Sequence, residues 1–108
     1  MNWLSHLFSS DANTPEWDAG AQLVDVRSGG EYASGHVDGA LHLSLDRFVQ
    51  NHAAALPDKS KQIILYCQSG ARSGQATQFL QQQGYANVIN GGSAGAVAMK
   101  TNRRIIRS

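Results

Sequence analysis

Short apolar runs recur along this chain, and each predicts a buried β-strand. We expect four such strands, at residues 23–26, 40–43, 62–66 and 86–89. The run at 62–66 is the clearest, because its continuous apolar stretch suits a central strand of a parallel sheet. We expect Gly29-Gly30 to break the chain after the first run, and Gly91-Gly92 follows the last.

Between these runs the apolar positions follow helical spacing. Residues 31–34 predict a brief helical turn that stops at Gly35. A longer helix should start at a Ser44 cap and end at Pro57, which cannot continue a helix. Its expected buried stripe is Leu45, Phe48, Val49, Ala53 and Leu56. His52 lies on the same stripe, so we interpret it as a packed core histidine rather than a ligand.

A third helix carries apolar side chains at Ala76, Phe79 and Leu80. Gly84 stands where a helix ends in a left-handed residue, and Tyr85 after it is placed to pack back on Leu80. Strands that alternate with helices predict parallel βα units. The expected fold is therefore an α/β sandwich with helices on both faces of the sheet.

The size and composition of the chain limit its class. At 108 residues it has room for one domain with a modest core. Apolar residues make up 42% and charged residues 16%, which is typical of a folded globular protein. The formal charge is +1, so we expect no nucleic-acid partner. A single cysteine forms neither an internal disulfide nor a cysteine-rich metal site, and we expect no metal and no cofactor.

Charge is unevenly distributed, since residues 100–108 hold four basic residues and no acid. Taking those four from the nine of the whole chain leaves five basic residues against eight acidic ones. We expect this basic tail to be a frayed and solvated terminus. The alternative is that it steers small anions toward a site or contacts an acidic partner.

The start of the chain bears on its compartment. No apolar run approaches the roughly 20 residues that span a bilayer, so we expect no membrane partner. Residues 1–8 lack the basic region and the long apolar region of a signal peptide. We expect one helical face that packs on the domain, formed by Trp3, Leu4, Leu7 and Phe8. The expected location is therefore cytoplasmic, or periplasmic if a leader was removed before residue 1.

Cys67 carries the candidate chemistry. It directly follows the clearest strand, and ligands of open α/β sheets bind beyond the carboxyl ends of the strands. We expect residues 67–73 to join this strand to a helix, whose N-terminus would stabilise a thiolate. Gly70 lets the backbone curl so that amides point inward, while serine hydroxyls and Arg72 add donors and positive charge. These features favour a reactive thiolate over a small buried apolar side chain.

Several thiolate chemistries fit such a loop. A cysteine protease needs a nearby histidine base, and no feature designates any of the four histidines for that role. A cysteine-dependent phosphatase uses a thiolate in an amide cradle that ends in arginine, with a signature similar to Cys-x5-Arg. Here four residues separate Cys67 from Arg72. The shorter loop makes a smaller cradle, which favours a sulfur atom or thiosulfate over a phosphoryl group.

Three motifs in register resemble those of the rhodanese family. The first motif comprises residues 23–27 (Leu-Val-Asp-Val-Arg), 31–32 (Glu-Tyr) and 35–40 (Gly-His-Val-Asp-Gly-Ala). The second is the segment 64–73 around Cys67, and the third comprises Gly84-Tyr85, Val88 and Gly91-Gly92. Two further segments are similar to the small phage-shock-type periplasmic rhodaneses, namely residues 73–76 (Ser-Gly-Gln-Ala) and 97–100 (Val-Ala-Met-Lys).

The resemblance implies an α/β, rhodanese-like three-layer sandwich, in which helices flank a four- to five-stranded, mainly parallel sheet. It divides the chain into an N-terminal extension at 1–12, a rhodanese-like domain at 13–99 and the basic tail at 100–108. The brief stretch before Leu23 predicts that one edge strand and its helix are missing from the usual five-stranded sheet. Many members place a tryptophan after the Gly-Gly pair. Residues 93–97 lack it here, so we expect that last element to be shortened or looser.

The resemblance also implies a sulfurtransferase that works by ping-pong through a persulfide on Cys67. The thiolate takes the outer sulfur of thiosulfate or of a persulfide, and a thiophilic acceptor such as cyanide or a thiol removes it. Cys67 would be catalytic, and the substrate-binding residues would be Gln68, Ser69, Gly70, Ala71, Arg72 and Ser73. The expected partners are small sulfur anions, cyanide, or a thiol or persulfide acceptor, which includes a protein acceptor.

Four further residues are expected to act structurally near the site, namely Asp25, Arg27, Glu31 and His36. Arg27 and Glu31, four residues apart, should form an ion pair rather than bind substrate. His36 is expected to fix the loop between strands. Arg72 either holds the sulfonate oxygens of thiosulfate or turns outward to pair with an acid such as Asp25, and the sequence leaves both open.

Two other functions also stay open. A non-catalytic persulfide carrier or redox-sensing module needs the same cysteine and the same cradle. A small cysteine-dependent phosphatase or arsenate reductase would use the thiolate to attack an oxyanion instead.

Overall fold

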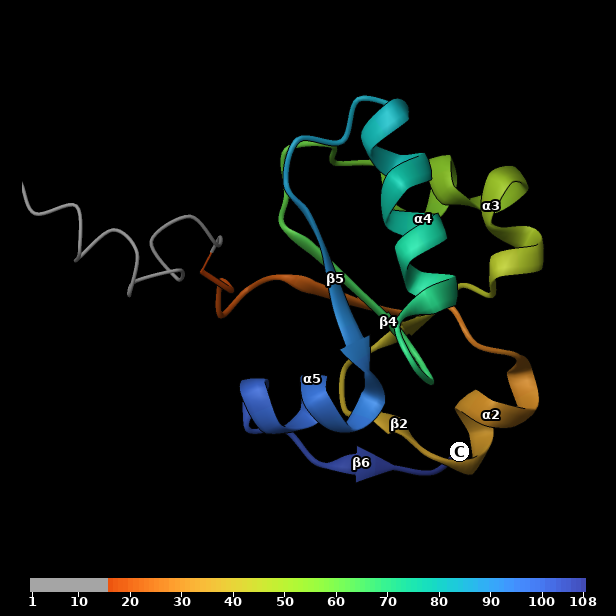
Figure 1. Cartoon of the computed structure of the whole chain (residues 1–108), viewed down its shortest axis with the longest axis vertical. Coiled ribbons are helices and arrows are strands. Elements are labelled where there is room, and N and C mark those ends of the chain that lie inside the picture. Colours follow the sequence, from red (N-terminus) through yellow and green to blue (C-terminus); the bar gives the residue numbers. More distant parts are fainter. Residues whose placement is uncertain (1–15) are drawn as a thin grey trace, which may run out of the picture.

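A four-stranded parallel sheet forms the centre of the structure, which is a computed structural model that describes residues 16–108 (Figure 1). Its strands are β1 (Gln22–Asp25), β3 (Leu41–His42), β4 (Ile63–Cys67) and β5 (Val88–Ser93). They lie in the order β3-β1-β4-β5, so β1 and β4 are the interior strands. The expected four- to five-stranded, mainly parallel sheet is confirmed.

Helices cover both faces of this sheet. They are α2 (Gly29–Ser34), the 3-10 turn η2 (Leu45–Arg47), α3 (Phe48–Ala55), α4 (Ala71–Gln82) and α5 (Ala94–Thr101). Figure 1 shows α3 and α4 together on one side of the strands and α5 on the other. The three-layer α/β sandwich is therefore confirmed.

Side chains of β4 alternate between the two layers of helices, as a strand requires. Ile63, Leu65 and Cys67 belong to the core on the side of α3 and α4. Ile64 and Tyr66 belong to the core on the side of α5. All five residues are buried, as expected for a central strand. The alternation directs the Cys67 side chain toward α4.

The helix expected from Ser44 differs in its first turn and in its buried stripe. It begins as the 3-10 turn η2, which has three residues per turn, so spacing counted from Leu45 does not carry into α3. As a result, Val49 is 65% exposed and Ala53 is also exposed, and the prediction that both are buried is wrong. Phe48 keeps the predicted buried position.

The ends of α2 and α4 follow from their capping residues. Gly29 and Gly30 were expected to break the chain, but they form the first turn of α2. Ser28 and Glu31 make a capping box there, in which the side chain of each accepts from the backbone N–H of the other. At the end of α4, Gly84 has φ 89°, and the N–H that follows it donates to the Leu80 carbonyl at 3.0 Å, as predicted.

Strand β5 is longer than predicted because it contains a bulge. Leu65 pairs with Asn90 whereas Tyr66 pairs with Gly92, so Gly91 is an extra residue in the strand. A Cβ at Gly91 would lie 2.7 Å from the Val97 side chain of α5, which a larger residue would displace. The bulge thus lets α5 approach the sheet. With eight residues and a side-chain cap, α5 is well formed, and the expected looser last element is wrong.

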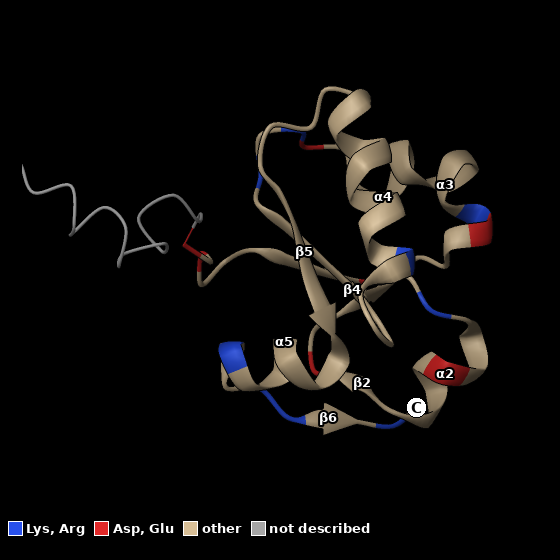
Figure 2. Cartoon of the chain, viewed as in Figure 1, with Lys and Arg blue, Asp and Glu red and all other residues tan. Residues whose placement is uncertain are grey.

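The C-terminal segment is not a frayed tail, and that expectation is wrong. Strand β6 (Ile105–Ile106) pairs antiparallel with β2 (His36–Val37). The Asp38 amide donates to the Arg104 carbonyl at 2.9 Å, and the Ser108 amide donates to the Ala33 carbonyl at 3.1 Å. Backbone pairing holds this segment while its arginines stay exposed, which Figure 2 shows as blue segments on both sides of β6.

Within residues 16–108, none of the helices is long and apolar enough to cross a membrane. The N-terminal extension at 1–12 and the helical face expected for Trp3, Leu4, Leu7 and Phe8 lie outside the described residues.

Candidate functional site

Cys67 is the last residue of β4 and lies at the carboxyl end of an interior strand of the sheet. Only three residues separate it from α4, which begins at Ala71. The expected loop over 67–73 is therefore shorter, because residues 71–73 form the first turn of the helix. Gly70 makes this tight junction with φ 99°, a left-handed conformation that favours glycine.

Hydrogen-bond donors surround the sulfur of Cys67. The Gly70 N–H donates to Sγ at 3.0 Å, and the Ser73 hydroxyl lies 3.5 Å from the same atom. Burial raises the pKa of Cys67, since only 1% of the residue is exposed. The Ser73 hydroxyl and the amides of Ser73, Gly70 and Ser69 outweigh burial and lower the pKa to about 7. The arrangement favours a thiolate in a cradle of N–H and O–H groups.

Asn90 of β5 holds this cradle together, although the sequence did not single it out. Its Nδ2 donates to the Gly70 carbonyl at 2.9 Å. Its Oδ1 accepts from the Gly92 N–H at 3.1 Å and from the Ser73 hydroxyl at 2.7 Å. The amide thus ties both ends of the cysteine loop to β5. The only signal in the sequence is a polar residue inside an otherwise apolar strand, directly before Gly91-Gly92.

Arg72 pairs with Glu31 of α2 rather than with Asp25. Nη1 and Nη2 of Arg72 contact the two carboxylate oxygens of Glu31 at 2.8 and 3.0 Å. This contact, together with the capping bonds from Ser28, lowers the pKa of Glu31 to about 2. The expected ion pair between Arg27 and Glu31 is wrong, because the first turn of α2 directs Glu31 toward α4 instead.

Arg27 forms a buried ion pair with Asp25. Its Nη2 lies 2.6 Å from Oδ2 of Asp25, whose side chain is fully buried. The same Nη2 donates to the Gly35 carbonyl at 2.6 Å, and the hydrogen bond that Arg27 donates to Asp25 is the main reason why the pKa of Arg27 is raised. These contacts fix the end of β1 to the end of α2, through a pair that differs from the expected partners of Asp25 and Arg27.

His36 is buried at the start of β2 and fixes the same loop. Its Nδ1 lies 2.8 Å from the Tyr32 carbonyl, to which it donates, and its ring stacks on the Tyr32 ring at 3.7 Å. The Tyr32 hydroxyl in turn donates to the Ala40 carbonyl at 3.0 Å. The position agrees with the expectation that His36 orders the connection between strands.

The structure therefore brings together only part of the predicted loop set. Gly70 and Ser73 face the sulfur with their donors. The side chains of Gln68, Ser69 and Ala71 are exposed and make no side-chain hydrogen bond within residues 16–108. The backbone amide of Ser69 helps to lower the pKa of Cys67, and the expected substrate-binding roles of Gln68 and Ala71 stay predictions.

Known proteins with similar sequences and structures include sulfurtransferases. Residues 8–97 match the family described as Rhodanese-like domain. The thiosulfate sulfurtransferase PspE of Escherichia coli (strain K12) is 37% identical over 81 residues, which cover 75% of this chain and 78% of that protein. A tRNA uridine(34) hydroxylase of Erwinia tasmaniensis is 35% identical over 94 residues, which cover 82% of this chain but 27% of that protein. Among solved structures, a rhodanese with anions from E. coli has a TM-score of 0.74 at 32% identity, covering 82% of this chain and 100% of that one.

Proposed function

This chain belongs to the rhodanese family, and from that premise we propose that it is a sulfurtransferase that carries sulfur as a persulfide on Cys67. The proposed donor is thiosulfate or another sulfane compound. The proposed acceptor is cyanide or a thiol.

The observation that carries this proposal is the set of donors around the Cys67 sulfur. With a pKa of about 7, roughly half of the thiol is ionised at neutral pH, whereas an ordinary cysteine is almost fully protonated. The thiolate is the nucleophilic form of cysteine. A ring of N–H and O–H groups also suits the negative charge of a terminal persulfide sulfur.

In the first half-reaction, the Cys67 thiolate attacks the outer sulfur of thiosulfate. A bond forms between Sγ and that sulfur while the sulfur–sulfur bond of thiosulfate breaks. Sulfite leaves with the electron pair, and the outer sulfur stays on the enzyme as a persulfide. Donation from Gly70 N–H and from the Ser73 hydroxyl supports the negative charge before and after the transfer.

In the second half-reaction, a nucleophilic acceptor attacks the outer sulfur of the persulfide. With cyanide, a carbon–sulfur bond forms, the Sγ–sulfur bond breaks and thiocyanate leaves. Cys67 is released as the thiolate, ready for another cycle. Because the chain has one cysteine, no second thiol of its own can resolve the persulfide, and the acceptor comes from outside.

For Arg72 we favour the structural alternative. Both ends of its guanidinium contact Glu31, and this pair also links α4 to α2. The same contact argues against a phosphatase or an arsenate reductase. In such an enzyme the loop arginine binds the oxyanion of the substrate, whereas the Arg72 guanidinium is occupied by Glu31. The persulfide carrier uses the same half-reactions and differs only in a requirement for protein partners.

Mass spectrometry of the intact protein after thiosulfate treatment tests the proposal. We expect a gain of one sulfur atom in the wild type and none in Cys67→Ala. Added cyanide should remove that atom and form thiocyanate in equal amount. A wild-type chain that gains no sulfur from any sulfane donor would refute the proposal. A protein that gains sulfur but transfers it to no small acceptor would instead favour the non-catalytic persulfide carrier.

A further inference from the structure

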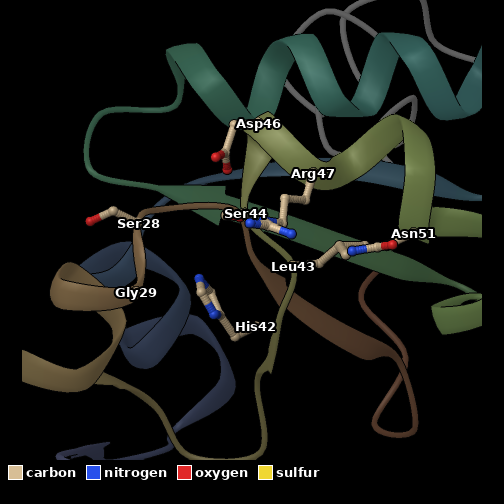
Figure 3. Close-up of a pocket in the computed structure, with 8 residues that line it drawn as sticks. All are labelled: Ser28, Gly29, His42, Leu43, Ser44, Asp46, Arg47 and Asn51. Carbon is tan, nitrogen blue, oxygen red and sulfur yellow. The ribbon is translucent and has the colours of Figure 1, made fainter.

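Two adjoining cavities lie at the carboxyl end of the sheet, beside the helix that follows Cys67. One, of about 380 Å³, is lined by Arg72 of α4 and by residues of the β1–α2 and β3–α3 connections. The other, of about 410 Å³, continues from it to His42 and Asn51 (Figure 3). The two share Ser28, Ser44 and Asp46 in their walls, so we treat them as one groove.

Two charged side chains of this groove differ from the others at this end of the sheet, because they form no ion pair within the part of the chain that the structure describes. Asp25 and Glu31 are paired with arginines, as described above. Asp46 and its neighbour Arg47, by contrast, have no ion-pair partner among residues 16–108. They are adjacent residues of the turn η2, and both line the larger cavity. The groove therefore offers one negative and one positive group a short distance apart.

Neutral polar groups add to this lining. The Ser44 hydroxyl makes no capping bond to the turn that follows it. His42 donates from Nε2 to the Arg27 carbonyl at 2.8 Å, because a carbonyl can only accept. In the neutral ring, Nδ1 is then left as an acceptor. Figure 3 shows the His42 ring and the Arg47 side chain extending into the same hollow below Asp46.

This lining does not suit the sulfur donor or cyanide. Thiosulfate is a dianion, which a carboxylate such as Asp46 repels, and cyanide has neither an ammonium nor a carboxylate group for the groove to bind. A ligand with an ammonium and a carboxylate group matches both charges of the groove.

We propose that the groove binds the sulfur acceptor, and that this acceptor is a small thiol with the ammonium and carboxylate groups of an amino acid. This inference rests on the proposed sulfurtransferase function and names its acceptor class. Asp46 binds the ammonium group and Arg47 binds the carboxylate. The smaller cavity adjoins the cysteine loop, since Arg72 in its wall lies in the first turn of α4 and the N–H of Val26 in its wall donates to the carbonyl of Tyr66, the residue before Cys67.

The transfer step then needs no further reactant. The acceptor thiolate attacks the outer sulfur of the Cys67 persulfide, forming a new sulfur–sulfur bond. The bond from Sγ to the outer sulfur breaks, and Cys67 leaves as a thiolate with the electron pair. The product is the persulfide of the acceptor.

The test follows sulfur transfer from preloaded protein by mass spectrometry, with four acceptors. Cysteine carries both charged groups, cysteamine only the ammonium, 3-mercaptopropionate only the carboxylate, and cyanide neither. Each thiol rate is divided by the cyanide rate of the same variant, which cancels effects on the persulfide itself. The variants are Asp46→Asn and Arg47→Gln, with Asp38→Asn as a matched exposed carboxylate outside the groove.

For Asp46→Asn, we expect the ratio to fall about fivefold with cysteine and cysteamine but not with 3-mercaptopropionate. For Arg47→Gln, the ratio should fall with cysteine and 3-mercaptopropionate but not with cysteamine. The Asp38 control should leave every ratio unchanged. Equal rate ratios in all variants, or a fall in the ratio that is the same for all three thiols, would overturn the groove proposal alone. A wild type that cannot be loaded with sulfur would instead overturn the function on which it rests.

Discussion

Replacement of Ser73 by alanine is a direct test of the donors around Cys67. Ser73 is fully buried, and its hydroxyl lies 3.5 Å from Sγ. The substitution removes this donor without adding atoms to the core. Burial already opposes the thiolate, so with one donor fewer we expect the pKa of Cys67 to rise.

The size of the effect follows from the geometry of this hydroxyl. A hydrogen bond to a charged group contributes about 1.5–3 kcal/mol to stability. The contact to Sγ is long, and the Ser73 hydroxyl shares its single proton with Asn90 at 2.7 Å. We therefore assign this hydroxyl a stabilisation of the thiolate of about 1 kcal/mol. That energy lowers the ratio of thiolate to thiol about fivefold. With a wild-type pKa of about 7, the thiolate fraction at about pH 6 should fall by nearly this factor, while both proteins are fully ionised at high pH.

The assay is a pH titration of the ultraviolet absorbance of the thiolate, with Cys67→Ala as the blank. One cysteine in the chain makes the signal specific. The midpoint is a better measure than an alkylation rate, since a thiolate of higher pKa is also intrinsically more nucleophilic. Ser69→Ala is the matched control, because its exposed side chain lacks a contact to Sγ and only its amide helps to lower the pKa of Cys67. A Ser73→Ala titration that superimposes on the wild type, or an equal change in Ser69→Ala, would refute the assigned donor.

Three further substitutions test other parts of the structure. Arg27→Met leaves its buried carboxylate partner unpaired, so urea denaturation should show a loss of about 3–5 kcal/mol in the free energy of unfolding. A loss below about 1 kcal/mol would contradict this role of the ion pair. Gly91→Ala places a Cβ 2.7 Å from a side chain of α5 and should destabilise the fold by about 1–3 kcal/mol, whereas Gly95→Ala, with open space around it, should stabilise α5 by about 0.5–1 kcal/mol. Equal melting temperatures for the two variants would show that the bulge relaxes. Glu31→Gln frees the charge of Arg72, so the KM for the thiosulfate dianion should fall about twofold at low salt and converge with the wild type at high salt. A change in KM that persists at high salt would exclude this electrostatic explanation.

The sheet and its layers could be predicted because they depend on patterns that are local in the sequence. The continuous apolar run of β4 and the glycine end of α4 need no knowledge of distant residues. The position of Cys67 at a strand end follows from the same pattern. The strands β2 and β6 are different, since their two residues have no periodicity and each strand exists only because it pairs with the other.

The candidate site was harder to predict where contacts join distant parts of the chain. Spacing along a helix made Arg27 the obvious partner of Glu31, yet the observed partner is Arg72, 41 residues away. Asn90 contacts Ser73 across 17 residues and carries no motif of its own. Such choices depend on how α2 and β5 pack against the start of α4. Sequence spacing therefore identified the nucleophile but not the residues that orient its surroundings.

The order of strands in the sheet has a consequence for synthesis on the ribosome. β1 pairs with β4, although about 40 residues lie between them, and β5 follows only after α4. At about 5–20 residues per second, roughly 2–8 seconds pass between the synthesis of β1 and that of β4. Through that interval β1 can pair with β3 on one edge, while its other edge has no strand to pair with. The Asn90 contacts that tie the cysteine loop to β5 form last, since β5 follows α4 in the chain, so the surroundings of Cys67 are completed only when the last strand of the sheet is in place.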